Sequence, residues 1–304
     1  MADLTITIAG VTFKNPVMTA SGTYGYGDEY SDLYDPAKLG AVSSKGLTLD
    51  PREGNPPPRI WETPAGLLNS IGLNNMGMKH FITNKCPELE AKGISVLANI
   101  AGKTIEEFGE MAALCNTSSA IKAVEVNVSC PNVHEGGMAF GLKCENIHTV
   151  TCTVKRFTAK PVIVKLSPNV TDITEMAGAA IEGGADGLTL INTLLGMAID
   201  IHTWKPIFHN TVAGLSGPAI KPVALRMVYQ VKKKYPHIPI IGVGGIATLT
   251  DAIEFFLAGA SAIQVGTALF NDPMLPMRLI DEINAYCDAR GVVSLQDLIG
   301  KAIR

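Results

Sequence analysis

Residues 240–267 of the chain are IIGVGGIATLTDAIEFFLAGASAIQVGT, a stretch in which two short apolar runs flank a helical pattern. The runs are Ile240–Val243 and Ala262–Val265, and each is followed by a glycine. Thr250 is a candidate N-cap for the helix between them. Continuous apolar runs of this kind are typical of parallel strands that are buried on both faces. The stretch therefore predicts a strand, a helix and a second parallel strand.

Six similar apolar runs precede this stretch, at residues 17–20, 41–44, 95–98, 123–126, 162–164 and 187–191. Each is followed by a turn and a helical pattern, such as the one that Thr104 would cap. Eight strands that alternate with helices predict a (β/α)8 TIM barrel, with an open doubly wound sheet as the alternative. Closure is favoured by the residues after the runs, because polar side chains and glycines there would meet at the mouth of a barrel. These residues are Ser21, Lys45, Asn99, Asn127, Lys165, Asn192, Gly244 and Gly266. With no linker and no further repeat, we assign residues 1–304 to a single domain.

Three long connections interrupt the regular spacing, after the second, fourth and sixth predicted strands. The second of them carries Cys130, and the third contains Trp204. Long connections inside a compact domain are usually functional. We therefore expect these three insertions to lie over the mouth of the barrel as lids.

The composition argues against several classes of function. The 304 residues are 47% hydrophobic, and 25 basic against 28 acidic side chains give a formal net charge of -3. With no long run of either sign, neither a nucleic-acid surface nor a polybasic membrane anchor is expected. Without a signal peptide or a membrane-spanning segment, the chain is expected in the cytoplasm. The six cysteines form no Cys-x-x-Cys pair, so no metal site is predicted.

The glycines after the last two strands indicate a phosphate site. Gly244, Gly245 and Gly266 would let backbone N–H groups approach an anion closely. The loops after strands seven and eight are also the usual phosphate site of such barrels. The alternative is that these glycines only make tight turns. Two glycine turns at this pair of strands favour a phosphorylated ligand or cofactor.

Lysines and asparagines near the other strand ends indicate a second, planar ligand. Lys45 and Lys165 are costly to desolvate unless they meet an anion, although either alone could be a rim lysine whose head reaches water. A single asparagine at a strand end would be explained as a cap or turn residue. Four together offer donors and acceptors suited to a heterocycle with N–H and C=O groups: Asn69, Asn99, Asn127 and Asn192.

Cys130 is the candidate base. It lies in the loop NVSCPN, residues 127–132, and has no sequence-adjacent His that would make it a protease-type nucleophile. A thiol has a reference pKa of about 8.5, so it can act as a general base towards a weakly acidic C–H group, most effectively at alkaline pH. The alternative is an inert buried thiol.

Four motifs in combination resemble the dihydroorotate dehydrogenases of pyrimidine biosynthesis. They are residues 45–46, 52–59, 69–74 and 127–132, and the resemblance extends over nearly the whole chain. It implies an FMN-binding (β/α)8 barrel that oxidises dihydroorotate to orotate. The soluble class 1 enzymes of the family use Cys as the base, where the membrane-associated class 2 enzymes use Ser. Cys130 therefore matches class 1.

Segments 132–141, 192–200 and 214–222 are similar to class 1B. This similarity implies a catalytic subunit that pairs with an electron-transfer subunit carrying FAD and a [2Fe-2S] cluster, with NAD as the final acceptor. A homodimer of barrels inside a heterotetramer is implied with it. The alternative is a class 1A homodimer that passes electrons to fumarate. The chain departs from the class 1B pattern at Trp204, where a basic residue is usual, and near residues 143–144, where an acidic-Pro turn is usual.

The resemblance also assigns roles to single residues, with Cys130 as the catalytic base. It implies FMN contacts at Ser21, Lys45, Gly46, Asn99, Asn127, Lys165, Ile191, Gly217, Gly244, Gly245, Gly266 and Thr267. The last four of these would hold the phosphate. It implies orotate contacts at Lys45, Asn69, Ser70, Ile71, Gly72, Leu73, Asn127, Asn192 and Thr193.

In the implied reaction, Cys130 removes a proton from C5 of dihydroorotate while hydride leaves C6 for flavin N5. Lys165 would stabilise negative charge on the reduced flavin. One rival hypothesis is a flavin-free, phosphate-binding isomerase or aldolase in which Lys165 forms a Schiff base. The other is a non-catalytic scaffold barrel, which leaves Cys130, both lysines and the four asparagines unexplained.

Overall fold

Eight parallel strands close into a barrel in the structure, a computed structural model that describes residues 2–128 and 140–304. In chain order the barrel strands are β3 (Val17–Thr19), β4 (Ala41–Ser43), β7 (Val96–Ile100), β8 (Ile121–Asn127), β9 (Val162–Lys165), β10 (Gly187–Leu190), β15 (Ile240–Val243) and β16 (Ala262–Val265). Each strand pairs with its neighbours in the chain, and β16 pairs with β3 to complete the ring. The predicted barrel and its eight strands are confirmed.

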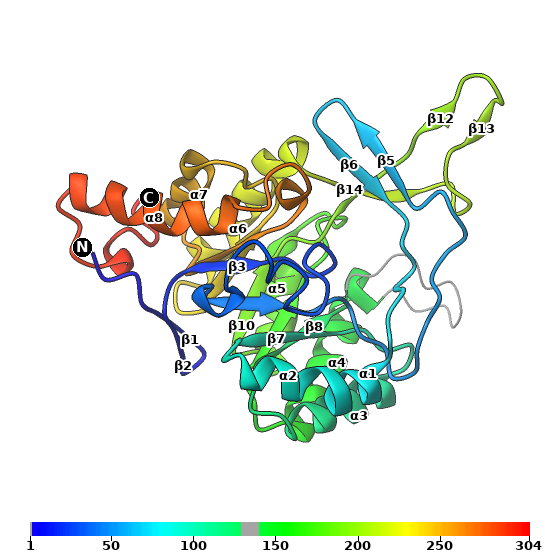
Figure 1. Cartoon of the computed structure of the whole chain (residues 1–304), viewed down its shortest axis with the longest axis horizontal. Helices are drawn as coiled ribbons and strands as arrows, with labels where there is room; N and C mark the ends of the chain where they lie inside the picture. The colour runs from blue at the N-terminus through cyan, green and yellow to red at the C-terminus, as the bar shows by residue number, and fades with distance from the viewer. Residues whose placement is uncertain (1, 129–139) are drawn as a thin grey trace.

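Helices form a layer around this barrel (Figure 1). The longer ones are α3 (Ile105–Cys115), α4 (Cys144–Phe157), α5 (Ile173–Glu182), α6 (Lys221–Lys234), α7 (Leu249–Leu257) and α8 (Leu275–Ala289). Before β7, the short helices α1 (Met78–His80) and α2 (Cys86–Ala91) flank a π-helical turn, Phe81–Lys85. From α3 to α8, each helix contacts the next along the chain. The helical layer therefore follows the order of the strands.

Two of the helix starts test the sequence predictions directly. Thr104 caps α3 as predicted, because its hydroxyl accepts a hydrogen bond from the N–H of Glu107 at 3.3 Å. The cap of α7 is Thr248 rather than Thr250. Thr248 and Asp251 form a capping box in which each side chain accepts from the backbone N–H of the other, so the cap lies two residues before the predicted one and the helix begins at Leu249.

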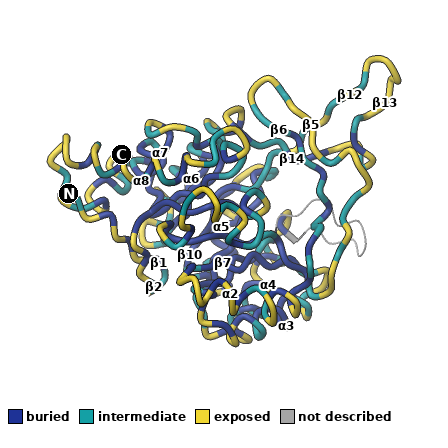
Figure 2. Tube along the Cα trace, viewed as in Figure 1, coloured by how far each residue is buried: buried dark blue, intermediate teal, exposed yellow. Residues whose placement is uncertain are grey.

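The contact between the barrel and its helices is apolar, and Figure 2 shows the barrel strands as buried. Phe108 of α3 and both Phe255 and Phe256 of α7 are at most 1% exposed. Burial of a side chain of this size contributes about 1.5–3 kcal/mol to folding. The burial of both strand faces explains why the strands are continuous apolar runs in the sequence.

The insertions after β4 and β10 contain regular structure. Strands β5 (Ile60–Thr63) and β6 (Gly66–Asn69) from the first join β14 (Ala213–Ser216) and β11 (Leu194–Gly196) from the second in one antiparallel sheet. This sheet stands above the barrel in Figure 1. The role of these two insertions as lids stays a prediction. In the remaining insertion, which follows β8, residues 129–139 lie outside the described residues.

A second hairpin, β12 (Ile199–Asp200) and β13 (Lys205–Pro206), projects beyond this sheet (Figure 1). Trp204 lies in its turn and is 87% exposed, so the residue that departs from the class 1B pattern is on the surface of this chain. The other departure falls at the start of α4, where Lys143 is the N-cap and makes no side-chain capping bond.

The N-terminal hairpin lies at the opposite end of the barrel from the mouth. It consists of β1 (Ile6–Ile8) and β2 (Val11–Phe13). Ile8 packs beside Gly187, the first residue of β10. No helix in the described part of the chain is long and apolar enough to cross a membrane.

Candidate active site

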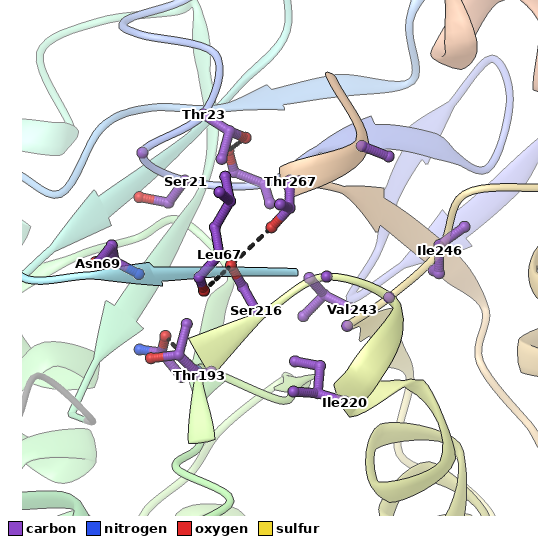
Figure 3. Close-up of a pocket in the computed structure, with 18 of the residues that line it drawn as sticks. Ser21, Thr23, Leu67, Asn69, Thr193, Ser216, Ile220, Val243, Ile246 and Thr267 are labelled. Atoms are coloured by element: carbon purple, nitrogen blue, oxygen red, sulfur yellow. Dashed lines mark hydrogen bonds between the residues drawn. The ribbon is translucent and has the colours of Figure 1, made fainter. Parts of the chain in front are cut away.

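A cavity opens where the carboxyl ends of the barrel strands meet the antiparallel sheet. It encloses about 970 Å³ of space, part of which is open to solvent. Its walls come from the ends of β3, β9, β10, β15 and β16 and from strands β5, β6 and β14. Figure 3 shows Asn69 and Thr193 at one side of this cavity and Ile246 at the other. The barrel mouth is where this fold places its active sites.

The side formed by β15 and β16 presents backbone N–H groups. Gly244 and Gly245 have φ angles of +131° and +74°, a region that glycine enters without steric cost. A Cβ on Gly245 would lie 2.7 Å from Cβ of Lys221, so this turn packs directly against the start of α6. Among the described residues, no acceptor bonds the N–H groups of Gly245, Ile246 and Gly266. N–H groups arranged in this way at strand-to-helix turns can bind an anion.

Gly217 and Thr267 attach the antiparallel sheet to this side of the cavity. A Cβ on Gly217 would lie 2.7 Å from Cα of Gly66, so two backbones approach closely there. The Thr267 hydroxyl is 2.8 Å from Oγ of Ser216, which in turn donates to the carbonyl of Leu67 at 3.3 Å (Figure 3). The insertion after β4 is thereby fixed against the end of the last barrel strand.

Lys165 and Glu125 form an ion pair beneath the cavity. The side chain of Lys165 is 6% exposed, and its Nζ lies 3.6 Å from Oε1 of Glu125, which is fully buried. Burial alone would raise the pKa of the Glu125 carboxyl, but the charge of Lys165 and hydrogen bonds from Gln264, Asn99 and Thr189 outweigh it, and the pKa is lowered. The barrel interior therefore holds a carboxylate directly beside the cavity lysine.

Three of the predicted asparagines form one connected row. Asn127 donates through Nδ2 to Oδ1 of Asn99 at 3.4 Å, and Asn192 donates through Nδ2 to Oδ1 of Asn127 at 3.4 Å. The N–H of Thr193 then donates to Oδ1 of Asn192 at 2.8 Å. The row extends from the barrel interior to the cavity wall.

The loop after β6 is supported by residues of segment 52–59. Asn55 donates to the Ser70 hydroxyl at 3.0 Å, and it packs so closely on Gly72 that a Cβ there has no room. Asn69 lies in β6 and donates to the carbonyl of Gly214 in β14 at 3.2 Å. Asn69 and Ile71 line the cavity, whereas Ser70 and Gly72 face Asn55.

Lys45 follows β4 and is half-buried. Burial lowers the pKa of Lys45 below the usual value for lysine, and the nearby positive charge of Arg59 lowers it further, while Glu29 acts in the opposite direction. The next residue, Gly46, is closely covered, because a Cβ there would lie 3.2 Å from Oδ1 of Asn99 and 3.0 Å from Cδ2 of Leu73.

Most of the predicted site residues lie together. The cavity is lined by Ser21, Asn69, Ile71, Lys165, Ile191, Asn192, Thr193, Gly217, Gly244, Gly245, Gly266 and Thr267. Asn99 and Asn127 are bonded to this set through the asparagine row, and Gly46 lies next to both Asn99 and Leu73. Lys45, Ser70 and Gly72 are not part of the lining. Cys130 lies outside the described residues, so its position stays a prediction, as do the roles of all these residues.

Glu125 is the site feature that the sequence reasoning missed. It interrupts the apolar strand IKAVEVN, residues 121–127, and an uncompensated charge in such a strand is costly. This cost could have indicated Glu125 as a site residue, because a buried carboxylate requires a cation or several hydrogen-bond donors nearby.

A family model for dihydroorotate dehydrogenase matches residues 3–287. The chain belongs to the dihydroorotate dehydrogenase family. Within this family, curated relatives that are similar to the chain over almost its whole length carry the name dihydroorotate dehydrogenase B (NAD(+)), catalytic subunit.

Three such dihydroorotate dehydrogenase relatives come from different bacteria. The protein of Desulforamulus reducens is 53% identical over 300 residues, which cover 99% of this chain and 98% of the relative. The protein of Geotalea uraniireducens is 50% identical over 301 residues, with 99% and 98% covered. The protein of Bacteroides thetaiotaomicron is 50% identical over 300 residues, with 99% of each chain covered.

Proposed function

We propose that this chain is the FMN-binding catalytic subunit of a class 1B dihydroorotate dehydrogenase, which oxidises dihydroorotate to orotate in pyrimidine biosynthesis. One observation carries the proposal. A single cavity at the barrel mouth joins a backbone N–H cradle to a buried lysine and a row of asparagines. Family membership supports the same reaction.

The residues of the cavity fit FMN. The N–H groups of Gly245, Ile246 and Gly266 offer donors to a phosphate, and the close packing at Gly245 and Gly217 leaves space for no other side chain there. Lys165 lines the cavity at the end of β9 and is paired with the buried Glu125, and there it would meet the flavin ring. Bound FMN supplies hydride acceptance at N5, and the protein supplies binding, orientation and electrostatics.

The opposite side of the cavity fits a planar, anionic substrate. Asn69, Asn192 and Thr193 would hold the ring of dihydroorotate through its N–H and C=O groups. We assign Lys45 to the substrate carboxylate, with Ser70 to Leu73 as the loop that covers it. Amides and an ammonium fixed in this way would stabilise charge that develops during oxidation.

Cys130 is proposed as the base that removes the C5 proton. Its thiolate would accept this proton while hydride leaves C6, so that the two electrons of the C–H bond pass to the cofactor and the proton to the protein. A positioned base typically contributes about 10²- to 10⁴-fold to such a step.

The proposal is tested with purified protein and its Cys130→Ser variant. The parent should be yellow, and dihydroorotate should bleach its flavin absorbance in an anaerobic stopped-flow experiment. The variant should retain FMN but reduce it about 10²- to 10⁴-fold more slowly at neutral pH. A colourless protein that FMN does not reconstitute would refute the function, whereas an unchanged rate in the variant would remove only Cys130 from the mechanism.

We further propose that the chain works with an electron-transfer subunit that carries FAD and a [2Fe-2S] cluster and passes electrons to NAD. The relatives support this through the words "NAD(+)" and "catalytic subunit" in their names. A homodimer of barrels inside a heterotetramer is the proposed assembly.

Electron acceptors distinguish this assembly from a class 1A enzyme. The isolated chain and the complex that co-purifies with it are assayed with NAD, fumarate and quinone. NAD reduction by the complex alone is expected. Fumarate reduction by the isolated chain would instead assign it to class 1A.

A further inference from the structure

Glu125 carries a buried carboxylate, and each of five other barrel strands supplies one polar partner to it. Its Oε1 accepts from the Ser43 hydroxyl of β4 at 3.0 Å and from Nδ2 of Asn99 of β7 at 2.6 Å. Its Oε2 accepts from the Thr189 hydroxyl of β10 at 2.9 Å and from Nε2 of Gln264 of β16 at 2.8 Å. The fifth contributor is β9, through the Lys165 ion pair.

This arrangement suits an ionised carboxylate. Four neutral donors and one ammonium face the two oxygens, which an ionised group accepts without offering a proton of its own. An uncompensated buried charge costs several kcal/mol, and apolar residues of similar volume often stabilise a fold equally well or better. Stability alone therefore does not account for a glutamate at this position.

The carboxylate also determines the direction of the asparagine row. Because Glu125 only accepts, Asn99 must turn its Nδ2 towards it, which leaves Oδ1 of Asn99 to accept from Asn127. The same logic repeats at Asn127, whose Oδ1 accepts from Asn192. Every donor in the row then points towards Glu125, although an amide side chain by itself can adopt either orientation.

We propose that Glu125 is a positioning residue of the active site, which sets the orientation of the three asparagine amides and supplies the counter-charge of Lys165. It touches neither ligand and acts through side chains that do. The proposal rests on the proposed function, because it assumes that FMN and orotate meet Lys165, Asn127 and Asn192.

Removal of this charge has a defined electrostatic consequence. Reduced flavin carries negative charge, and Glu125 partly offsets the stabilisation that Lys165 provides to it. A neutral residue at position 125 would leave the positive charge of Lys165 unopposed in a site of low dielectric constant. Reduction of bound FMN should then become easier.

Glu125→Gln removes the charge with little change in shape. The N–H groups of the new amide can find an acceptor nearby. Oε1 of Gln264 has no hydrogen-bond partner among the described residues, and a rotation of the Gln264 amide group would direct this oxygen towards residue 125. We expect the midpoint potential of bound FMN to rise by about 30 mV or more, which is a tenfold change for a two-electron couple. Orotate affinity should fall about tenfold, because the new amide, unlike the carboxylate, can present either its oxygen or its nitrogen to Asn99 and therefore no longer fixes the orientation of the row.

Glu282→Gln is the matched control. It makes the same chemical change on the outer face of α8, where Glu282 pairs with Arg278 at 3.3 Å and is 37% exposed. Neither the flavin potential nor orotate affinity should change in this variant.

Glu125→Asp separates charge from position. It retains the carboxylate but shortens the side chain, so that it cannot reach both Asn99 and Gln264. The potential should stay close to that of the parent, while orotate affinity still falls. If Glu125→Gln does not fold, this variant carries the test, and a parental orotate affinity would overturn the proposal.

The outcomes also distinguish the two proposals. A parent protein without FMN would refute the proposed function. A Glu125→Gln variant that binds FMN and oxidises dihydroorotate with parental potential and parental orotate affinity would overturn only the role of Glu125.

Discussion

The two sides of the cavity are built from different parts of the chain. The side proposed to hold the phosphate, here called the phosphate side, presents backbone N–H groups of Gly245, Ile246 and Gly266. The side proposed to hold the rings, here called the ring side, presents the side chains of Lys165 and Asn192. The first depends on a turn that excludes any Cβ, and the second on a network that ends at a buried carboxylate. One side should therefore be sensitive to added volume, and the other to changes of charge and amide orientation.

This difference follows from the ligands that each side is proposed to hold. A phosphate presents the same oxygens from every direction, so a ring of N–H groups binds it without side-chain specificity. A pyrimidine ring has a fixed order of donors and acceptors, which requires amides of fixed orientation. Separate substitutions on each side can test whether the two behave independently.

The largest effect is expected from an added methyl group on the phosphate side. Gly245→Ala forces an L side chain into a φ of +74° and places Cβ 2.7 Å from Lys221 Cβ, so the turn must move. The loss of one or two charge-assisted hydrogen bonds should weaken FMN binding about 100-fold, measured by fluorescence titration of the apoprotein.

Gly93→Ala is the control for this substitution. Gly93 has a similar φ of +68°, but a Cβ there would meet nothing within 4 Å. It should lower stability by about 1 kcal/mol and leave FMN affinity unchanged. A parental FMN affinity in Gly245→Ala would contradict the role of this turn in the cradle, and an equal loss in both variants would assign the effect to backbone strain.

A smaller effect is expected from Lys45 on the ring side. Lys45→Met should weaken orotate binding about 10- to 100-fold, since a charged hydrogen bond is lost, and weaken FMN binding much less. The pKa of Lys45 is lowered by burial and by Arg59. The ammonium is present below this pKa and lost above it, so orotate binding to the parent should weaken as pH rises, starting at a lower pH than for an ordinary lysine.

Spectral titration of the bound flavin with orotate between pH 7 and pH 10 would measure this dependence. Lys45→Met should lack the alkaline decline. A decline of the same size in both proteins would assign it to another group.

The barrel could be predicted from the sequence because parallel strands that are buried on both faces leave a pattern of continuous apolar runs. The glycine turns after β15 and β16 could be predicted as well, since glycines at strand ends are local signals, and their role in phosphate binding stays a prediction. Residues 60–69 and 194–216 were harder to interpret, because their strands pair with each other across about 150 residues of sequence, as between Leu68 and Leu215. No local pattern specifies such a pairing.

The ring side required more than local signals. The asparagines were found one by one as strand-end residues, but their row depends on contacts such as that of Asn192 with Asn127, 65 residues apart in the chain. Glu125 was missed because its partners come from five different strands. The resemblance to a known family supplied Ser70 and Gly72 as orotate contacts, and the structure turns both towards Asn55.

The smallest effect on ligand binding should come from Asp251, which supports the phosphate side from outside the cavity. It accepts from the N–H groups of Ala247 and Thr248 and from Lys221 Nζ at 2.6 Å. Asp251→Ala removes one half of the capping box of α7 and one partner of Lys221 and should lower the free energy of unfolding by about 2 kcal/mol. FMN affinity should fall only a few-fold, because the glycine turn itself is intact.

Acid titration gives this prediction a second test. Burial would raise the pKa of Asp251, but hydrogen bonds from Lys221, Ala247 and Thr248 outweigh it and lower the pKa. The stabilisation is therefore present above the pKa of an unfolded aspartate, about 3.9, and is lost as pH falls through the lower folded value. The free energies of unfolding of the parent and of Asp251→Ala, measured with urea, should converge in this acidic range.

Asp272→Ala is the control, which removes an exposed partner of Arg278 and should lower the free energy of unfolding by about 1 kcal/mol or less at neutral pH. An Asp251→Ala variant that lost FMN as completely as Gly245→Ala would show that the phosphate side depends on the helix behind it as much as on its own backbone.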